Sequence, residues 1–392
     1  MRSGAFIDSL RPYICVRSFC LLDIPPPDEY NFAVKECVNM KKIVAYLKLI
    51  AFVLASVGQI FAPMTAAYIH GENSFFEDWS PAQAYTEDYA VTIEKDPDKD
   101  FVILNLTDPQ INAWDAFDEK GMITTAIIDE MVEKTQPDLI TVTGDNAWNW
   151  DAYLKLVQDL DKFGIPWAPV MGNHDGEGCP SEFWCAYQFH AAKNCVFKFG
   201  PKDMGYGNYI INITENGKII HTLYMMDTHS NAKADSINAA EDGTADYDHL
   251  WKNQIAWYKW AVNGTNAIAG NTVESSVFIH IPLYEYRQFE KYLDAETTFG
   301  ENREAVCSPE GNNGFFTLCK ELGSTKNVIC GHEHVNSVSF VLDGIRLTYA
   351  LKTGAGCYWD RDMSGGTTLT VDSDGHGTIQ HVYSQVAVAE QN

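Results

Sequence analysis

The sequence has few basic residues for its size. Of its 392 residues, 28 are Lys or Arg and 53 are Asp or Glu, which gives a net charge of −25 at pH 7. Nucleic acids and anionic membrane surfaces attract proteins that carry clustered positive charge. The shortage of such charge argues against a nucleic acid partner. A small phosphorylated substrate can still bind, because a metal ion can supply positive charge locally.

Cysteine clusters of the kind that bind zinc are also lacking. Three of the ten cysteines lie near the N-terminus, and the others do not have the spacing of a zinc site. Cysteine is therefore not expected as a metal ligand. In an exported protein these residues would favour disulfides, and the best candidates are a bond between Cys307 and Cys319 and a pair among Cys179, Cys185 and Cys195.

Internal repeats, low-complexity tracts and long Pro/Ser linkers are absent from the sequence after residue 70. Hydrophobic residues make up 46% of the chain, which is enough for a proper core. We therefore expect residues 68–392 to form a single domain.

Residues 40–67 have the order of a signal peptide: two lysines, an apolar run, and then small residues. The alternative is a membrane tether through residues 43–62, since about 20 apolar residues can span a bilayer, although Lys48 argues against it. Residues 1–39 show no clear periodicity, and we interpret them as non-structural or upstream of the true start. The expected location is secreted or extracytoplasmic, with a membrane-anchored form as the alternative.

From about residue 100, short apolar runs alternate with amphipathic stretches, which is typical of layered α/β folds. From Val338 to Val386 the pattern changes to strand-like runs separated by Gly and Asp turns, which predicts a second sheet. The expected strands are 101–107, 138–144, 165–172, 276–282 and 327–331, and the expected helices are 119–135, 150–163, 247–262 and 314–322.

Each expected strand ends in a polar cluster that contains residue types able to bind divalent metals. One such cluster alone would be weak evidence, because Gly-Asp-Asn is usually a turn. Five such clusters, one after each expected strand, are harder to explain as a set of ordinary turns. The clusters are Asp108-Pro109-Gln110, Gly144-Asp145-Asn146, Gly172-Asn173-His174-Asp175, His280 and Gly331-His332-Glu333-His334.

The order of these clusters resembles the calcineurin-like metallophosphoesterase superfamily, in its purple-acid-phosphatase-like or Dcr2-like branch. The resemblance covers residues 101–334. It implies an α/β fold, a four-layer αββα double β-sandwich with metals at the carboxyl ends of the strands. The alternation of strands and helices agrees with this fold but does not define it.

The resemblance also implies two divalent metal ions, Mn, Fe or Zn, with Asp145 as the bridging ligand. A metal-bridging hydroxide would attack phosphorus. His174 would act as acid or charge stabiliser, with Asp175 holding its ring. One metal would be held by Asp108, Gln110, Asp145 and His334, and the other by Asp145, Asn173, His280 and His332.

Two positions depart from the common family pattern. Gln110 stands where many members have His, and its neutral amide oxygen is a weaker donor for transition metals than imidazole. Trp148 stands where purple acid phosphatases have Tyr, so a tyrosine-bound ferric ion is not expected.

The expected function is hydrolysis of a phosphate ester, with a monoester favoured over a diester. The alternatives are a phosphodiesterase or nucleotide hydrolase of the same fold, and a non-catalytic binding protein with a weakened site. Asp227-Thr228-His229 can be a turn or part of the site. Further candidates for substrate contact are Tyr284, Tyr286, Arg287, Tyr349 and Lys352.

Overall fold

The computed structural model describes residues 57–58, 61–111, 119–231 and 247–386. Contacts cluster into two units, Met1–Ala62 and Pro63–Asn392, and the strands that the structure describes all lie in the second. Most of the expected signal peptide, residues 40–67, lies outside the described residues. Residues 1–39 lie wholly outside them. No helix among the described residues is both long and apolar enough to cross a membrane.

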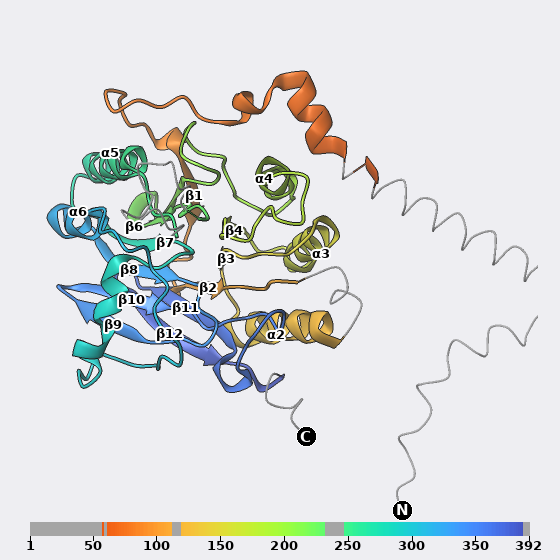
Figure 1. Ribbon diagram of the computed structural model, residues 1–392. Coiled ribbons are helices and arrows are strands. Elements are labelled where there is room, and N and C mark those ends of the chain that lie inside the picture. The colour runs from red at the N-terminus through yellow and green to blue at the C-terminus, as the bar shows by residue number, and fades with distance from the viewer. Residues whose placement is uncertain (1–56, 59–60, 112–118, 232–246, 387–392) are drawn as a thin grey trace, which may run out of the picture. The chain divides into compact units, whose positions relative to one another are not determined.

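The described strands form two sheets (Figure 1). The seven-stranded sheet has the order β1-β5-β6-β7-β8-β10-β9, and the five-stranded sheet has the order β12-β11-β2-β3-β4. The strands of the first are β1 (Ala90–Glu94), β5 (Tyr209–Glu215), β6 (Lys218–Met225), β7 (Glu274–Phe278), β8 (Thr325–Cys330), β9 (Ser339–Leu342) and β10 (Ile345–Tyr349); those of the second are β2 (Phe101–Leu106), β3 (Leu139–Thr143), β4 (Trp167–Val170), β11 (Gly365–Val371) and β12 (Gly377–Tyr383).

Parallel pairing brings the carboxyl ends of the central strands to one edge of each sheet. In the five-stranded sheet, β2 pairs parallel with β3 and β3 with β4. In the seven-stranded sheet, β6 pairs parallel with β7, β7 with β8 and β8 with β10. All five residues of β3 are buried, because both faces of this strand are covered. This explains why its sequence, Leu-Ile-Thr-Val-Thr, contains no charged residue.

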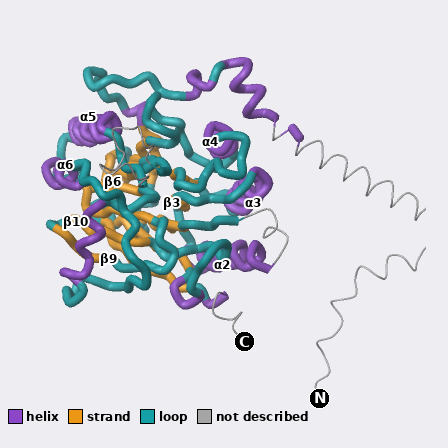
Figure 2. The backbone as a smooth tube through the Cα atoms, viewed as in Figure 1, coloured by secondary structure: helices purple, strands orange, loops and turns teal. Residues whose placement is uncertain are grey.

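Helices cover the outer face of each sheet, which makes four layers (Figures 1 and 2). The helices α2 (Glu119–Thr135), α3 (Trp150–Asp161) and α4 (Glu182–Ala191) pack with the five-stranded sheet in one hydrophobic cluster. The helices α5 (Lys252–Ala269) and α6 (Phe315–Leu322) pack with the seven-stranded sheet in another. The two sheets touch through β4 with β6 and through β12 with β7. The expected αββα architecture is confirmed. The short 3₁₀ helices are Glu72–Phe75, Glu87–Tyr89, Tyr284–Tyr292 and Arg361–Met363.

Buried aromatic rings join the helices to the sheets. Trp167 of β4 packs edge-on against Phe189 of α4, with ring centroids 5.7 Å apart. Tyr258 of α5 contacts Tyr224 of β6 and Phe315 of α6 in the same geometry. Because such rings bury large apolar areas, they fix the helices against the strands that carry the polar clusters.

The C-terminal strands differ from the sequence expectation. Instead of forming a second sheet themselves, they are divided between the two sheets: β9 and β10 extend the larger one, and β11 and β12 extend the smaller one. Periodicity detects strands, but long-range pairing decides which strands become neighbours. The helix expected at 247–262 begins later, at Lys252, and α4 was not predicted.

The seven cysteines in the described part of the chain are free thiols. Cys307 lies near the carboxyl group of Glu333, whereas Cys319 is buried beside Tyr258, so the bond expected between these two cysteines is absent. The thiols of Cys179 and Cys185 do contact each other.

Candidate metal centre

The structure brings the predicted ligands together from both sheets. Each follows the carboxyl end of a parallel strand, and each is buried. This placement follows from the parallel pairing, which aligns those strand ends. Asp108 and Gln110 follow β2, Asp145 follows β3, Asn173 follows β4, His280 follows β7, and His332 and His334 follow β8.

The backbone at these strand ends is unusual. Asp108, Asp145 and His332 have positive φ angles of 49°, 48° and 81°. Non-glycine residues adopt this region only when their surroundings impose it, and such strain clusters at functional sites. Two glycines permit the close approach of neighbouring turns. A Cβ on Gly172 would lie 2.1 Å from the backbone nitrogen of Asp145, and one on Gly331 would lie 2.0 Å from Oγ1 of Thr107.

Three donor atoms lie close to Nε2 of His280. His280 Nε2 lies 2.9 Å from Asn173 Oδ1, 3.3 Å from Asp145 Oδ1 and 3.3 Å from His332 Nδ1. Ligands bound at about 2.1 Å to one ion are separated from one another by roughly 3 Å. The spacing of these groups around His280 is therefore of the size expected between ligands of a divalent metal ion.

A second group of donors lies beside the first. Oδ1 of Asp108 is buried and accepts no hydrogen bond, and Nε2 of His334 lies 3.4 Å from it. A buried carboxylate oxygen without a partner is costly, and a cation would satisfy it. Ligand atoms of Asp108, Asp145 and His280 all lie within 4.8 Å of one another. Asp108 and His334 thus also fit a metal ion.

Gln110 does not offer its oxygen to this group. Its amide nitrogen donates a hydrogen bond to Oδ2 of Asp145 at 2.8 Å. Its amide oxygen accepts one from Nζ of Lys352, also at 2.8 Å. In this orientation the carboxamide is a hydrogen-bonding partner of the ligand Asp145, and its oxygen is already engaged.

The carboxylates and imidazoles of the centre shift one another's pKa values. Burial raises the pKa of Asp108, but the contact with His334 and the charge of His280 outweigh burial and lower it. Burial lowers the pKa of His334, yet Asp108 raises it to about 9 overall. The pKa of His280 is also raised, because Asp145 and Asp108 outweigh its burial. Without metal the imidazole of His334 therefore holds a proton, which a metal ion has to displace.

His174 lies at the open side of the centre. Its backbone N–H donates to Oδ1 of Asp145 at 3.0 Å, and its side chain is 37% exposed. The ring packs on Trp148, with centroids 4.6 Å apart, and its Nδ1 lies 3.0 Å from Oε1 of Glu177. The imidazole is thus held beside the ligands while it stays accessible to a substrate.

Asp175 does not contact the ring of His174, which corrects the role expected for it. Its buried carboxylate accepts hydrogen bonds from the backbone and side chain of Asn146 at 2.9 and 2.7 Å, and from the backbone of Gly172 at 2.7 Å. Burial and then the charge of Asp145 raise its pKa to about 6. Asp175 therefore ties the turn after β3 to the turn after β4, and Glu177 is the partner of the His174 ring.

Three further residues at the centre were not predicted as parts of it. The ring of Tyr247 meets that of His332 edge-on, with centroids 4.5 Å apart. Ser230 donates its hydroxyl to the backbone oxygen of Asn173 at 2.9 Å. Lys352 was expected only as a candidate for substrate contact. None of the three belongs to a local motif, so no sequence signal could have identified these contacts.

Asp227 holds a turn beside the centre. It accepts hydrogen bonds from the backbone nitrogens of Tyr206 and His229 at 2.8 and 2.7 Å. Tyr206 and His229, with Gly172 and Asp175, line a small hollow of about 40 Å³ next to the metal cluster. The structural role of Asp227 is therefore clear from its contacts.

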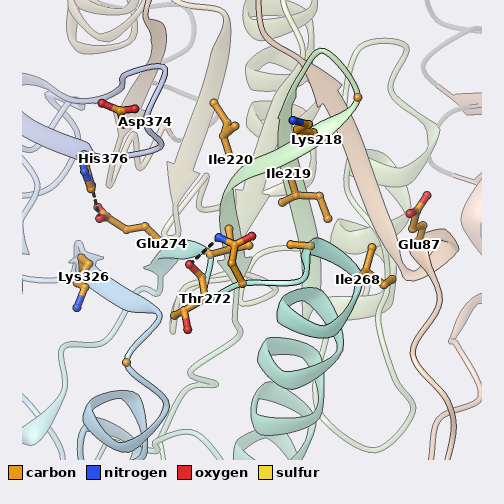
Figure 3. A pocket seen from close by; sticks show the side chains of 15 residues that line it. Glu87, Lys218, Ile219, Ile220, Ile268, Thr272, Glu274, Lys326, Asp374 and His376 are labelled. Atoms are coloured by element: carbon orange, nitrogen blue, oxygen red, sulfur yellow. Dashed lines mark hydrogen bonds and ion pairs between the residues drawn. The ribbon is translucent and has the colours of Figure 1, made fainter.

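A larger hollow, of about 730 Å³, lies elsewhere (Figure 3). Lys218, Ile268 and Lys326 are among the residues that line it, and the side chains of Glu274 and His376 point toward each other across one part of it. None of the predicted site residues lines this hollow, so its size does not make it the active site.

The profile of the family described as calcineurin-like phosphoesterase matches residues 101–336. The chain is 30% identical over 247 residues to the Arabidopsis thaliana protein named "Probable inactive purple acid phosphatase 14", covering 58% of this chain and 61% of the relative. It is 29% identical over 232 residues to phosphatase DCR2 of Saccharomyces cerevisiae, covering 54% and 38%. The chain thus spans about three fifths of the plant protein and two fifths of the yeast one.

Among solved structures, a dimetal phosphatase from Danio rerio superposes with a TM-score of 0.46 and 10% identity, covering 72% of this chain and 99% of that one. A purple acid phosphatase from yellow lupin superposes with a TM-score of 0.39 and 12% identity, covering 74% and 55%.

Proposed function

The chain belongs to the calcineurin-like phosphoesterase family, and we propose that it is a metal-dependent phosphatase that hydrolyses phosphate esters, with monoesters favoured. The observation that carries the proposal is that one carboxylate, one amide oxygen and a second imidazole lie within 3.3 Å of Nε2 of His280. A satisfied structural cluster would not need four buried metal-binding groups from both sheets.

We propose two ion positions. The residues of the first are Asp108, Asp145 and His334, and those of the second are Asp145, Asn173, His280 and His332. When bound, divalent ions at such positions supply Lewis acidity, an acidified water and charge that neutralises the phosphoryl oxygens. Mn, Fe and Zn all suit the mixed nitrogen and oxygen ligands.

His174 is the proposed acid. Its exposed ring can reach the leaving oxygen of a substrate, and Trp148 and Glu177 restrict the orientation of that ring. Donation of a proton to the leaving oxygen avoids release of an alkoxide, which is the usual benefit of a positioned acid. Tyr247 packs edge-on against His332 and can border a substrate.

A phosphodiesterase or nucleotide hydrolase is the second candidate, and a non-catalytic binding protein is the third. The word "inactive" in the name of the plant relative favours the third. The presence of all the expected metal-binding residue types and of His174 supports catalysis, because a decayed site would have lost several of them.

Exported location is a separate proposal that rests on the signal-peptide order of residues 40–67. A tether through residues 43–62 remains its alternative.

The central test is activity of the metal-loaded protein on para-nitrophenyl phosphate and on bis-para-nitrophenyl phosphate. Asp145→Asn should abolish turnover with the fold retained, because this change removes the charge shared by both positions. Hydrolysis of the diester alone would favour the second candidate. Full activity of Asp145→Asn with normal metal content would exclude the proposed site.

A further inference from the structure

Lys352 is a buried cation at the edge of the metal centre. It follows β10, and only 1% of it is exposed. Its Nζ donates to the backbone oxygen of Asp108 at 2.9 Å and to the amide oxygen of Gln110 at 2.8 Å. The salt bridges of the described residues do not include one to Lys352. The ammonium therefore has polar partners but no paired carboxylate at contact distance.

The charge of this ammonium must be balanced at longer range, because an unpaired buried charge is costly. Burial lowers the pKa of Lys352 to about 8, and the charges of Asp108, Cys357 and Asp145, in decreasing order, partly offset that effect. Asp108 and Asp145 are the carboxylates assigned to the first ion position. The ammonium and a metal ion at that position would thus be neutralised by the same two carboxylates.

The ammonium also fixes the direction of the Gln110 carboxamide. An amide oxygen accepts hydrogen bonds and an amide nitrogen donates them, so the present orientation satisfies both ends. Reversing the amide would place its NH₂ against the ammonium of Lys352 and its oxygen against the carboxylate of Asp145. Both contacts would be repulsive, which disfavours Gln110 as a metal ligand while Lys352 is charged.

We propose that Lys352 is a positioning residue that keeps the first ion position weak, because its resident positive charge turns the oxygen of Gln110 away from that position. The centre then holds one ion tightly, on Asp145, Asn173, His280 and His332, and a second ion weakly. This inference rests on the proposed function in one respect, that the cluster binds divalent metal.

The distance between Nζ of Lys352 and the ion determines how strongly the ammonium weakens ion binding. A metal ion binds a ligand oxygen at about 2.1 Å, so an ion sharing the oxygen of Gln110 would lie within about 5 Å of Nζ of Lys352. Like charges that close repel strongly even at an effective dielectric constant of about 20. Removal of the ammonium should therefore tighten the weaker ion about tenfold or more.

The test is a titration of Co²⁺ into metal-stripped protein, followed by the visible absorption of bound cobalt and by calorimetry. The wild type should show one tight and one weak ion per chain. Lys352→Met, which removes the charge and keeps an unbranched side chain one atom shorter, should tighten the weak ion about tenfold or more and leave the tight one nearly unchanged. Lys320→Met is the matched control, because Lys320 is an exposed lysine paired with Asp343, and the same loss of charge there should change neither ion.

An unchanged or weaker second ion in Lys352→Met would overturn the inference, since a merely structural lysine would not tighten it when removed. Gln110→Met provides a second arm that leaves Lys352 in place, and it decides the question if Lys352→Met does not fold. Little change in Gln110→Met supports the inference, whereas about tenfold weaker binding would show that Gln110 is a ligand and overturn it. Two equally tight ions in the wild type would overturn only this inference; no bound Co²⁺ at all would exclude the proposed function as well.

Discussion

At the scale of single residues, the candidate centre pairs carboxylates with imidazoles of opposite charge when protonated. The acidic ligands Asp108 and Asp145 face the imidazoles of His334 and His280 at 3.4 and 3.3 Å. Such pairs are stable without metal only while the imidazoles carry protons. The same contacts that stabilise the metal-free protein therefore oppose metal binding at low pH.

Metal affinity should rise with pH. The pKa of His334 is raised to about 9, so a metal ion must displace its proton at any lower pH. The pKa of Lys352 is lowered to about 8, so its repulsive charge is also lost as pH rises. Between about pH 6 and 8, affinity should increase by about tenfold per pH unit for each proton displaced. Calorimetry at several pH values checks this, and an affinity that does not depend on pH would contradict it.

The opposite trend is expected from His334 for the stability of the metal-free protein. A raised folded-state pKa stabilises the fold fully below the unfolded value and loses that contribution as pH rises through the folded value. For His334 the loss spans the range from 6.5 to about 9. Comparison of apo and metal-loaded unfolding across this range separates the two effects.

His174→Ala should lower turnover by about 10²- to 10⁴-fold, the usual contribution of a positioned acid, and should leave metal content nearly unchanged. His376→Ala is a suitable control, because His376 lies on the rim of the distant hollow shown in Figure 3. Metal analysis by mass spectrometry accompanies the kinetics. Loss of metal in His174→Ala would show that this residue is a ligand and not an acid.

At the scale of elements, the centre depends on how closely the turns after β3 and β4 approach each other. Asp175 bonds the two turns together through Asn146 and Gly172. Gly172 has no room for a side chain against the backbone of Asp145. The position of Asp145, the proposed bridging ligand, therefore depends on the packing of one turn against another.

Gly172→Ala should destabilise the protein by about 1–3 kcal/mol and weaken metal binding, because the added Cβ would force the two turns apart. Gly311→Ala is the matched control, since nothing lies within 4 Å of a Cβ placed there. Thermal unfolding and metal titration of both variants test the prediction. Equal stability of the two variants would mean that the turns can separate without cost.

Most of the central elements could be predicted from the sequence. The helix Glu119–Thr135 has the predicted bounds, and β2 and β3 differ from theirs by one residue at most at each end. Their apolar runs identify them locally. The distribution of β9–β12 over two sheets could not be predicted, because neighbours in a sheet are chosen by contacts between distant segments.

At the scale of the whole molecule, the negative charge is consistent with a small substrate. A chain with a net charge of −25 repels polyanions, whereas metal ions concentrate positive charge where a phosphate would bind. Selectivity for small phosphate esters over nucleic acids would follow from that contrast.

Residues before about Ala67 should be missing from the exported mature protein, because they have the order of a cleaved signal peptide. N-terminal sequencing of the secreted protein measures the start directly. A membrane-bound product that retains residues 43–62 would support the tether instead, and a product that stays in the cytoplasm with the whole segment would contradict both.

The sequence alone determined the types, the order and the strand-end positions of the metal-binding residues, because each cluster is a local motif and parallel strands align their ends. Only the tertiary structure decided which way the side chains point. Asp175 accepts a hydrogen bond from Asn146, and Glu177 contacts the ring of His174. Lys352, distant in the sequence, donates to Gln110. Hydrogen-bond direction depends on partners that packing brings together, and spacing along the chain carries no information about them.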